Sequence, residues 1–229
     1  MHKMRLRVLE IFASLFFTFL SLNPAYGHDF NVELSLGTGI WGGPWAQAVN
    51  DANLPLGLDT KGLIIPTLSA ATVWKGPPLF GPVRFNAAAG LGLWSGSLAG
   101  YQDGELQRAQ SILAFALEAQ PRLTAEFPIN QGHFIAELGL GFGIALGPVL
   151  SIDAFPGFMS VAKTSPDFFR RFFGTAGIGV GFRANGRFSY MMRAEAGIAD
   201  FGAAPGDGPT WIGRFQASIS YALPGKDSL

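Results

Sequence analysis

The feature that most constrains this chain is an alternation of apolar and polar side chains at a period of two residues. Such a period predicts β-strands, because successive side chains of a strand point to opposite faces. One face of each predicted strand is uncharged and mostly apolar, while the other holds charged side chains and many glycines. We interpret eight segments as strands: 30–41, 63–75, 83–95, 109–124, 132–147, 171–184, 187–200 and 210–223.

Composition narrows the class of protein further. The chain has 229 residues, of which 48% are hydrophobic and only 14% are charged, so it is not intrinsically disordered. It contains no cysteine, which excludes disulfides, thiolate metal sites and a cysteine nucleophile. The formal net charge is zero, which argues against a nucleic-acid partner.

The first 27 residues have the pattern of a secretory signal peptide. Lys3, Arg5 and Arg7 make the start of the segment basic, residues 11–22 form a short apolar run, and the small residues Ala25 and Gly27 lie at the cleavage position. The apolar run is shorter than the ~20 residues of a membrane-spanning helix. We therefore expect export and cleavage after Gly27.

After cleavage, we expect residues 28–223 to form one outer-membrane β-barrel, followed by a short tail over 224–229. Most predicted strands are long enough to cross a membrane, and aromatic residues gather near the ends of the apolar faces. The opposite faces combine glycine with long Arg and Glu side chains, which suits a narrow lumen better than a soluble surface. We expect a bulge or kink at Pro66 and at Pro121, since proline removes a ladder hydrogen bond.

The connections between the predicted strands alternate in length. Short turns on one side and long loops on the other are typical of outer-membrane barrels, and Asn185-Gly186 has the composition of a type I′ hairpin. This alternation predicts that both termini lie in the periplasm. The long connections are 42–62, 96–108, 148–170 and 201–209, and the short ones are 76–82, 125–131 and 185–186.

Three segments carry a resemblance to a known group: residues 134–143 (FIAELGLGFG), 177–182 (GIGVGF) and the last predicted strand, which ends near Tyr221. They resemble strands of the small eight-stranded outer-membrane barrels, the OmpA-transmembrane, OmpX and OmpW-like group. The resemblance implies an eight-stranded antiparallel transmembrane β-barrel with an up-and-down meander. It also implies insertion by the barrel-assembly machinery, although many members end on an aromatic residue and this chain ends on the tail 224–229.

The charges on the inward faces are the candidate functional residues. A buried charge must be paired, so we expect a network of Arg–Glu ion pairs that plugs the lumen. The alternative is a narrow, gated path for ions or small solutes. We expect His133 to be a member of the network rather than a metal ligand. The predicted network comprises Glu33, Arg84, Glu118, Arg122, His133, Glu137, Arg183, Arg187, Arg193, Glu195 and Arg214.

Other sites are less well supported by the sequence. Arg170 and Arg171 follow Phe168 and Phe169, which suits a contact with lipopolysaccharide. The apolar faces carry no nucleophile–base pair, so a lipid A modifying enzyme is the weaker alternative. The glycine-rich runs 139–143 and 177–181 precede no helix and suit packing inside a lumen better than phosphate binding.

We therefore expect a structural or surface-interaction protein of the bacterial outer membrane, with no cofactor and no bound metal. Its expected partners are outer-membrane lipid, lipopolysaccharide and the barrel-assembly machinery. A soluble periplasmic lipocalin, suggested by Gly39-Ile40-Trp41, is the main alternative fold, but its exterior would be unusually rich in glycine.

Overall fold

The computed structural model describes residues 30–164, 171–184, 187–199 and 210–223. The predicted signal peptide, the tail 224–229, Asn185-Gly186 and the connection 201–209 lie outside these residues. The elements are β1 (Phe30–Trp41), α2 (Pro44–Asn53), the 3-10 turn η2 (Leu54–Leu56), β2 (Asp59–Leu63), β3 (Pro66–Phe80), β4 (Val83–Gln102), β5 (Glu105–Ile129), β6 (Gly132–Ala145), β7 (Val149–Phe155), β8 (Phe158–Thr164), β9 (Phe172–Ala184), β10 (Phe188–Ala199) and β11 (Thr210–Ala222).

The strands form one antiparallel sheet that closes on itself as a β-barrel. Hydrogen-bonded neighbours follow the order β1, β3, β4, β5, β6, β9, β10 and β11, and β11 pairs with β1 to complete the ring. The sheet contains eleven strands in the described part of the chain, whereas eight were predicted. The additional strands β2, β7 and β8 lie outside the ring, where β2 pairs with β4, β7 with β5, and β8 with β7.

The two faces of the wall have the predicted orientation. Outward side chains are apolar and exposed, as at Leu34 (56%) and Met192 (68%), whereas the inward Glu33 and Arg193 are buried (4% and 6%). A water-soluble barrel has the opposite arrangement, with its apolar face inside and its polar face outside. The outward hydrophobic residues of the ring strands therefore form an exterior wall.

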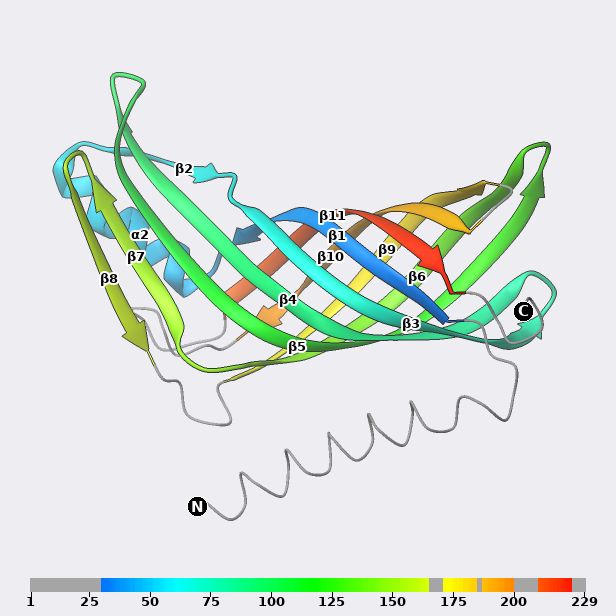
Figure 1. Ribbon diagram of the computed structural model, residues 1–229. Helices are drawn as coiled ribbons and strands as arrows, with labels where there is room; N and C mark the ends of the chain where they lie inside the picture. Colours follow the sequence, from blue (N-terminus) through cyan, green and yellow to red (C-terminus); the bar gives the residue numbers. More distant parts are fainter. Residues whose placement is uncertain (1–29, 165–170, 185–186, 200–209, 224–229) are drawn as a thin grey trace, which may run out of the picture.

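The connections at one end of the barrel are folded, whereas the sequence predicted long loops there. The predicted loop 96–108 is a continuation of β4 and β5, which meet at a turn over Asp103 and Gly104. Both turn residues have positive φ (53° and 84°), as a tight hairpin requires, and an Asp-Gly pair favours that conformation. The other two described connections at this end contain α2 with β2, and the β7–β8 hairpin. These elements extend beyond the ring at the left of Figure 1.

At the opposite end, the turns are tighter than predicted. Strand β3 extends to Phe80 and β5 to Ile129, so that only two residues separate each from the next strand. Pro66 is the first residue of β3, where a proline is tolerated. The β4–β5 register continues unchanged through Pro121, and the observed shifts between β3 and β4 lie around Pro78 instead. No register shift therefore marks a bulge at either proline, but the β5–β6 pairing is interrupted over Gln120 and Pro121, in agreement with the expected loss of a ladder hydrogen bond at Pro121.

Candidate functional site: charged layers inside the barrel

Two arginines on distant strands share two glutamates inside the barrel, and we call these four residues the turn-side layer. Arg193 Nη1 on β10 lies 2.8 Å from Glu33 Oε1 on β1, and Arg122 Nη2 on β5 lies 3.1 Å from the same oxygen. Arg193 Nε also lies 2.5 Å from Oε1 of Glu137 on β6. The layer is electrically balanced and links four strands across the lumen.

A second layer, the loop-side layer, lies around Arg214 on β11. Arg214 Nη2 is 2.9 Å from Glu118 Oε2 on β5 and 2.8 Å from Glu195 Oε2 on β10. The indole Nε1 of Trp94 on β4 donates a 2.7 Å hydrogen bond to Glu118 Oε1. The Gln120 amide donates to Glu118 at 3.1 Å. Every charged group in this layer therefore has an ionic partner, as burial demands.

Glycines on neighbouring strands make room for these side chains. A Cβ atom at Gly92 would lie 2.0 Å from Glu118 Oε1, and one at Gly177 would lie 2.7 Å from Glu195 Cγ. Both distances are shorter than carbon–carbon or carbon–oxygen contact allows. The inward glycines therefore leave the space that the long Glu and Arg side chains occupy, in agreement with the predicted packing of glycine inside the lumen.

An apolar plug lies next to the loop-side layer and contains α2. Trp45 of α2 packs edge-on against Trp41 at a ring-centroid distance of 6.3 Å, and Val49 is buried in the same cluster. The rings of Trp94 and Phe173 are in contact, with their centroids 4.5 Å apart and their planes tilted by 56°. A Cβ at Gly96 would lie 1.8 Å from the Trp41 ring, so glycine is required for this packing. These aromatic side chains occupy the barrel interior at the end where β2, β7 and β8 lie.

Little space remains between the two charged layers. Two internal cavities of about 10 Å³ each border Gln120 and Arg122, with Glu118 beside one and Glu195 beside the other. Each has room for about one water molecule.

A third cluster fixes α2 to the strands beyond the ring. Arg108 on β5 forms two hydrogen bonds with Asp153 on β7, at 2.9 and 2.6 Å, and a third with Asn53 at the end of α2. The hydrogen bonds from Arg108 to Asp153 raise the pKa of the guanidinium above its usual range. The sequence interpretation missed this cluster because the predicted loops 42–62, 96–108 and 148–170 gave its members no shared face.

The remaining predicted network residues lie nearer the turn end and do not join the two layers. Arg183 pairs with Glu126 at 2.6 Å, and Arg84 is half-buried with no ion pair among the described residues. His133 is half-buried opposite Arg183 in the β6–β9 register.

Arg187 differs from its predicted position. It is exposed, and its Nη1 donates a 3.3 Å hydrogen bond to the Tyr221 hydroxyl on the outside of the wall. It precedes the first residue of β10, Phe188, so the inward–outward alternation of the strand does not apply to it. Glu126, which the sequence interpretation placed in a turn, faces inward on β5 and is the ionic partner of Arg183.

The residues suggested for lipopolysaccharide contact are only partly visible. Arg171 is half-buried immediately before β9, and Arg170 lies outside the described residues.

Trp94, which bridges the plug and the loop-side layer, was not among the residues predicted from the sequence. The available signal was a large aromatic residue at an inward position of a strand whose nearest inward neighbours, Gly92 and Gly96, are glycines.

Two other kinds of feature are absent from the described residues. No three His, Asp or Glu side chains there are arranged to hold a metal ion. No helix there is long and apolar enough to span a membrane.

Comparison with known proteins adds a distant likeness of fold. No protein-family model and no curated protein matches the sequence. Among solved structures, similarity is found to Ail, the attachment invasion locus protein of Yersinia pestis, in complex with the heparin analogue sucrose octasulfate. That match has 8% identity and a TM-score of 0.39, and it covers 86% of this chain and 99% of Ail. A second Ail structure matches with 10% identity, a TM-score of 0.38 and the same coverage.

Proposed function

We propose that this chain is an integral β-barrel of the bacterial outer membrane with a structural or surface-interaction role. The observation that carries the proposal is the inverted wall, with large apolar side chains exposed around the ring and charged side chains buried inside it. Exposed apolar surface of this extent is unfavourable in water and favourable in lipid. Export by the predicted signal peptide over residues 1–27 is part of the same proposal.

The two ends of the barrel suggest its orientation. Outer-membrane barrels have short periplasmic turns and longer extracellular connections. The end with the tight β3–β4 and β5–β6 turns would then face the periplasm, and the end with α2 would face the cell surface (Figure 1). Strand β5 has 25 residues, well above the ~10 that cross a membrane, so part of it would stand outside.

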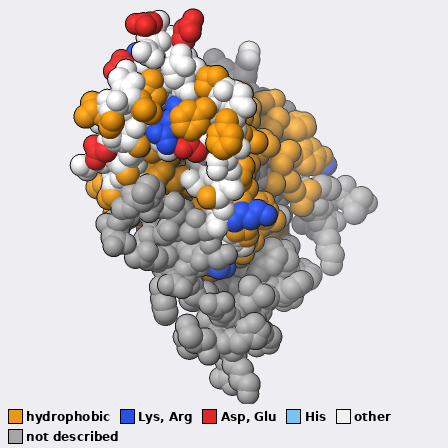
Figure 2. Space-filling model, turned by 90° about the vertical axis from the view of Figure 1, so that its left-hand side faces the viewer, with side chains coloured by type: hydrophobic (Ala, Val, Ile, Leu, Met, Phe, Trp, Pro, Cys, Tyr) orange, Lys and Arg blue, Asp and Glu red, His pale blue; other side chains and the backbone are white. Residues whose placement is uncertain are grey.

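The filled interior favours an interaction role over transport. Two layers of paired charges and an aromatic plug lie in series, and the cavities between the layers hold about one water each. A narrow channel, the alternative reading, would require these layers to open. The part of the sheet that stands beyond the ring, β2 with the ends of β4 and β5 and the β7–β8 hairpin, is the proposed interaction surface. Figure 2 shows charged side chains of both signs among hydrophobic ones at this end.

The expected partners follow from the membrane location. The barrel-assembly machinery would insert the chain, and lipopolysaccharide would surround the end with α2, where Arg170 and Arg171 remain the proposed contacts. A lipid A modifying activity is the weaker alternative, and it would change the mass of lipid A when the protein is overproduced.

Cell fractionation tests the location directly. The protein should be recovered in outer-membrane fractions and should migrate faster on SDS gels when unheated, as folded membrane barrels do. Recovery as a soluble periplasmic protein would reject the proposal. Planar-bilayer recording then separates the two roles, because a closed interior predicts no current steps under voltage and regular steps would favour the channel.

A further inference from the structure

The outer wall carries an apolar groove that crosses several strands. It has a volume of about 720 Å³ and runs over β10, β11, β1, β3, β4 and β5. The backbone of the inward-facing Ser35, Ser69 and Ser218, which are aligned by the strand register, contributes to its floor. Leu34 and Ile219 border one side, and Leu36 and Leu68 border the other. None of the described residues that line the groove is charged.

Small outward residues make the groove wide. Ala70 and Ala217 line the groove, and both are exposed. A larger side chain at either position would narrow the groove. Neighbouring strands are ~4.8 Å apart, so a groove over six strands extends roughly 24 Å. A lipid acyl chain spans about half of the ~30 Å hydrocarbon core, or roughly 15 Å. The length of the groove follows the curve of the wall, and it is long enough for one acyl chain that bends along the groove.

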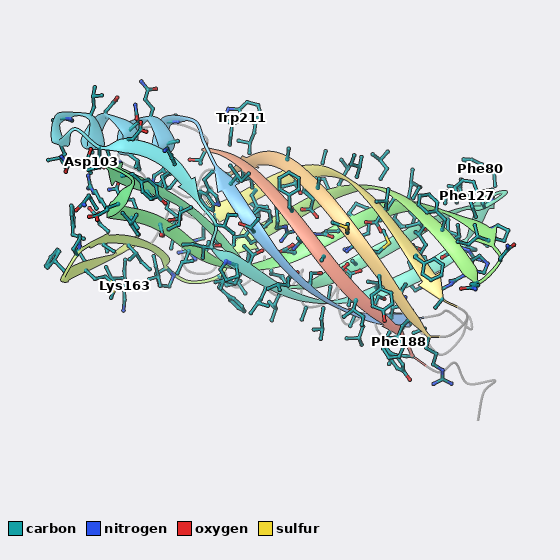
Figure 3. The ribbon with its side chains drawn as sticks, turned by 90° about the horizontal axis from the view of Figure 1, so that it is seen from above. Phe80, Asp103, Phe127, Lys163, Phe188 and Trp211 are labelled. Carbon is teal, nitrogen blue, oxygen red and sulfur yellow. The ribbon has the colours of Figure 1, made fainter. Side chains whose placement is uncertain are left out.

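A polar cluster lies at the turn-side end of the groove. Tyr190 borders the groove on β10, and the next outward residue toward the turn is Phe188, which packs against Tyr221 at a ring-centroid distance of 5.0 Å. Phe188 lies at the end of the barrel in Figure 3. The Arg187 guanidinium donates to the Tyr221 hydroxyl and is otherwise exposed. An exposed guanidinium among tyrosines suits a phosphate at a membrane interface.

We propose that this groove binds one glycerophospholipid of the leaflet on the turn side, with an acyl chain along the groove and the phosphate at Arg187. This inference rests on the proposed membrane function, and it deepens that function by identifying a specific lipid site. The apolar lining and the exposed Arg187 near one end match the two parts of such a lipid. Lipopolysaccharide would occupy the other leaflet in the proposed orientation, so the two lipids can be distinguished experimentally.

The test uses the full-length protein reconstituted in phosphatidylglycerol vesicles and then extracted in mild detergent. Native mass spectrometry counts the phospholipid molecules that remain bound. The wild-type protein should retain one phospholipid. Ala70→Trp and Ala217→Trp, which fill the groove, should each abolish retention. Arg187→Gln removes a charge-assisted contact with phosphate and should weaken retention about tenfold.

The matched control is Ala176→Trp, an exposed outward position on β9 outside the groove. It should retain lipid like the wild type. Heat-modifiable migration confirms that each variant has folded, so a failure of the barrel itself is detected separately from a failure of the lipid site. The proposal is overturned if the folded wild type retains no phospholipid, or if both groove-filling variants retain it. In a second experiment with vesicles that also contain lipopolysaccharide, retention of lipopolysaccharide that is sensitive to Ala70→Trp would also overturn it.

Discussion

The guanidinium of Arg214 lies over the face of the Trp94 ring, with Cζ 4.0 Å from the ring centroid, inside the barrel. The same indole donates a hydrogen bond to Glu118, the ionic partner of Arg214. Trp94 therefore supports both members of a buried ion pair, through a cation–π contact to one and a hydrogen bond to the other. It also joins the charged interior to the aromatic plug.

Removing Arg214 should destabilise the barrel strongly. Arg214→Met leaves Glu118 and Glu195 buried without their cation, and the loss of one partner from such a cluster costs about 3–5 kcal/mol. Urea titration of the protein refolded into detergent micelles measures the change in free energy of unfolding. Exposed Lys163→Met is the control and should change it by less than about 0.5 kcal/mol. Equal effects of the two substitutions would contradict the pairing of Arg214.

Inward glycines should differ from exposed ones in their tolerance of alanine. Gly96→Ala places a methyl group within the Trp41 ring and should cost roughly 1–3 kcal/mol through overpacking. Gly62→Ala adds a methyl group with nothing within 4 Å and should be close to neutral. Thermal or urea unfolding of both variants provides the comparison. If Gly96→Ala is as stable as the wild type, then the Trp41 side chain does not occupy the described position.

The plug and the charged layers should block the lumen independently. Replacing Trp45 and Val49 of α2 by alanine thins the plug but leaves both ion-paired layers in place. Planar-bilayer recordings of this double variant should therefore remain without current steps, as for the wild type. A conducting double variant would show that α2 alone closes the barrel, which would favour the channel alternative.

The cluster at Arg108 should keep the β7–β8 hairpin and α2 in place. Asp153→Asn removes the ionic acceptor of the two hydrogen bonds from Arg108, and charge-assisted bonds are worth about 1.5–3 kcal/mol. Amide hydrogen exchange in β7 should then become about tenfold faster or more, while exchange in β10 stays unchanged. Asp59→Asn, at an exposed pair with Lys61, is the control. No change in β7 would show that the hairpin is held by its backbone pairing alone.

Much of the barrel follows from the period-two pattern, because a strand with alternating side chains can lie in the wall in only two ways, with its polar face inward or outward. Glu33, Glu118 and Arg193 could be assigned inward positions for this reason. Their partners could not be assigned, since the pattern gives the face of a residue but not the height at which strands align. Arg122, for example, meets a glutamate 89 residues away.

Predictions failed where a tight turn or a tertiary contact decides the structure. Asp103-Gly104 is a hairpin signal within a segment that was interpreted as a loop, so the extension of β4 and β5 was missed. Helix α2 is short, and its buried Trp45 and Val49 are stabilised by the plug rather than by helical propensity. Arg187 has the parity of an inward residue, yet it precedes β10 and turns to Tyr221.

The ion pairs of Glu33 have a consequence for assembly. Its partner Arg193 lies 160 residues later in the chain, on a strand made near the end of synthesis. Contacts with so large a sequence separation form late and slowly. Until β10 arrives, Glu33 lacks one of its two cations, and a half-built barrel would expose that carboxylate to hydrocarbon at considerable cost. Completion of the wall and neutralisation of its interior are thereby coupled, which disfavours release of an unfinished barrel into the membrane.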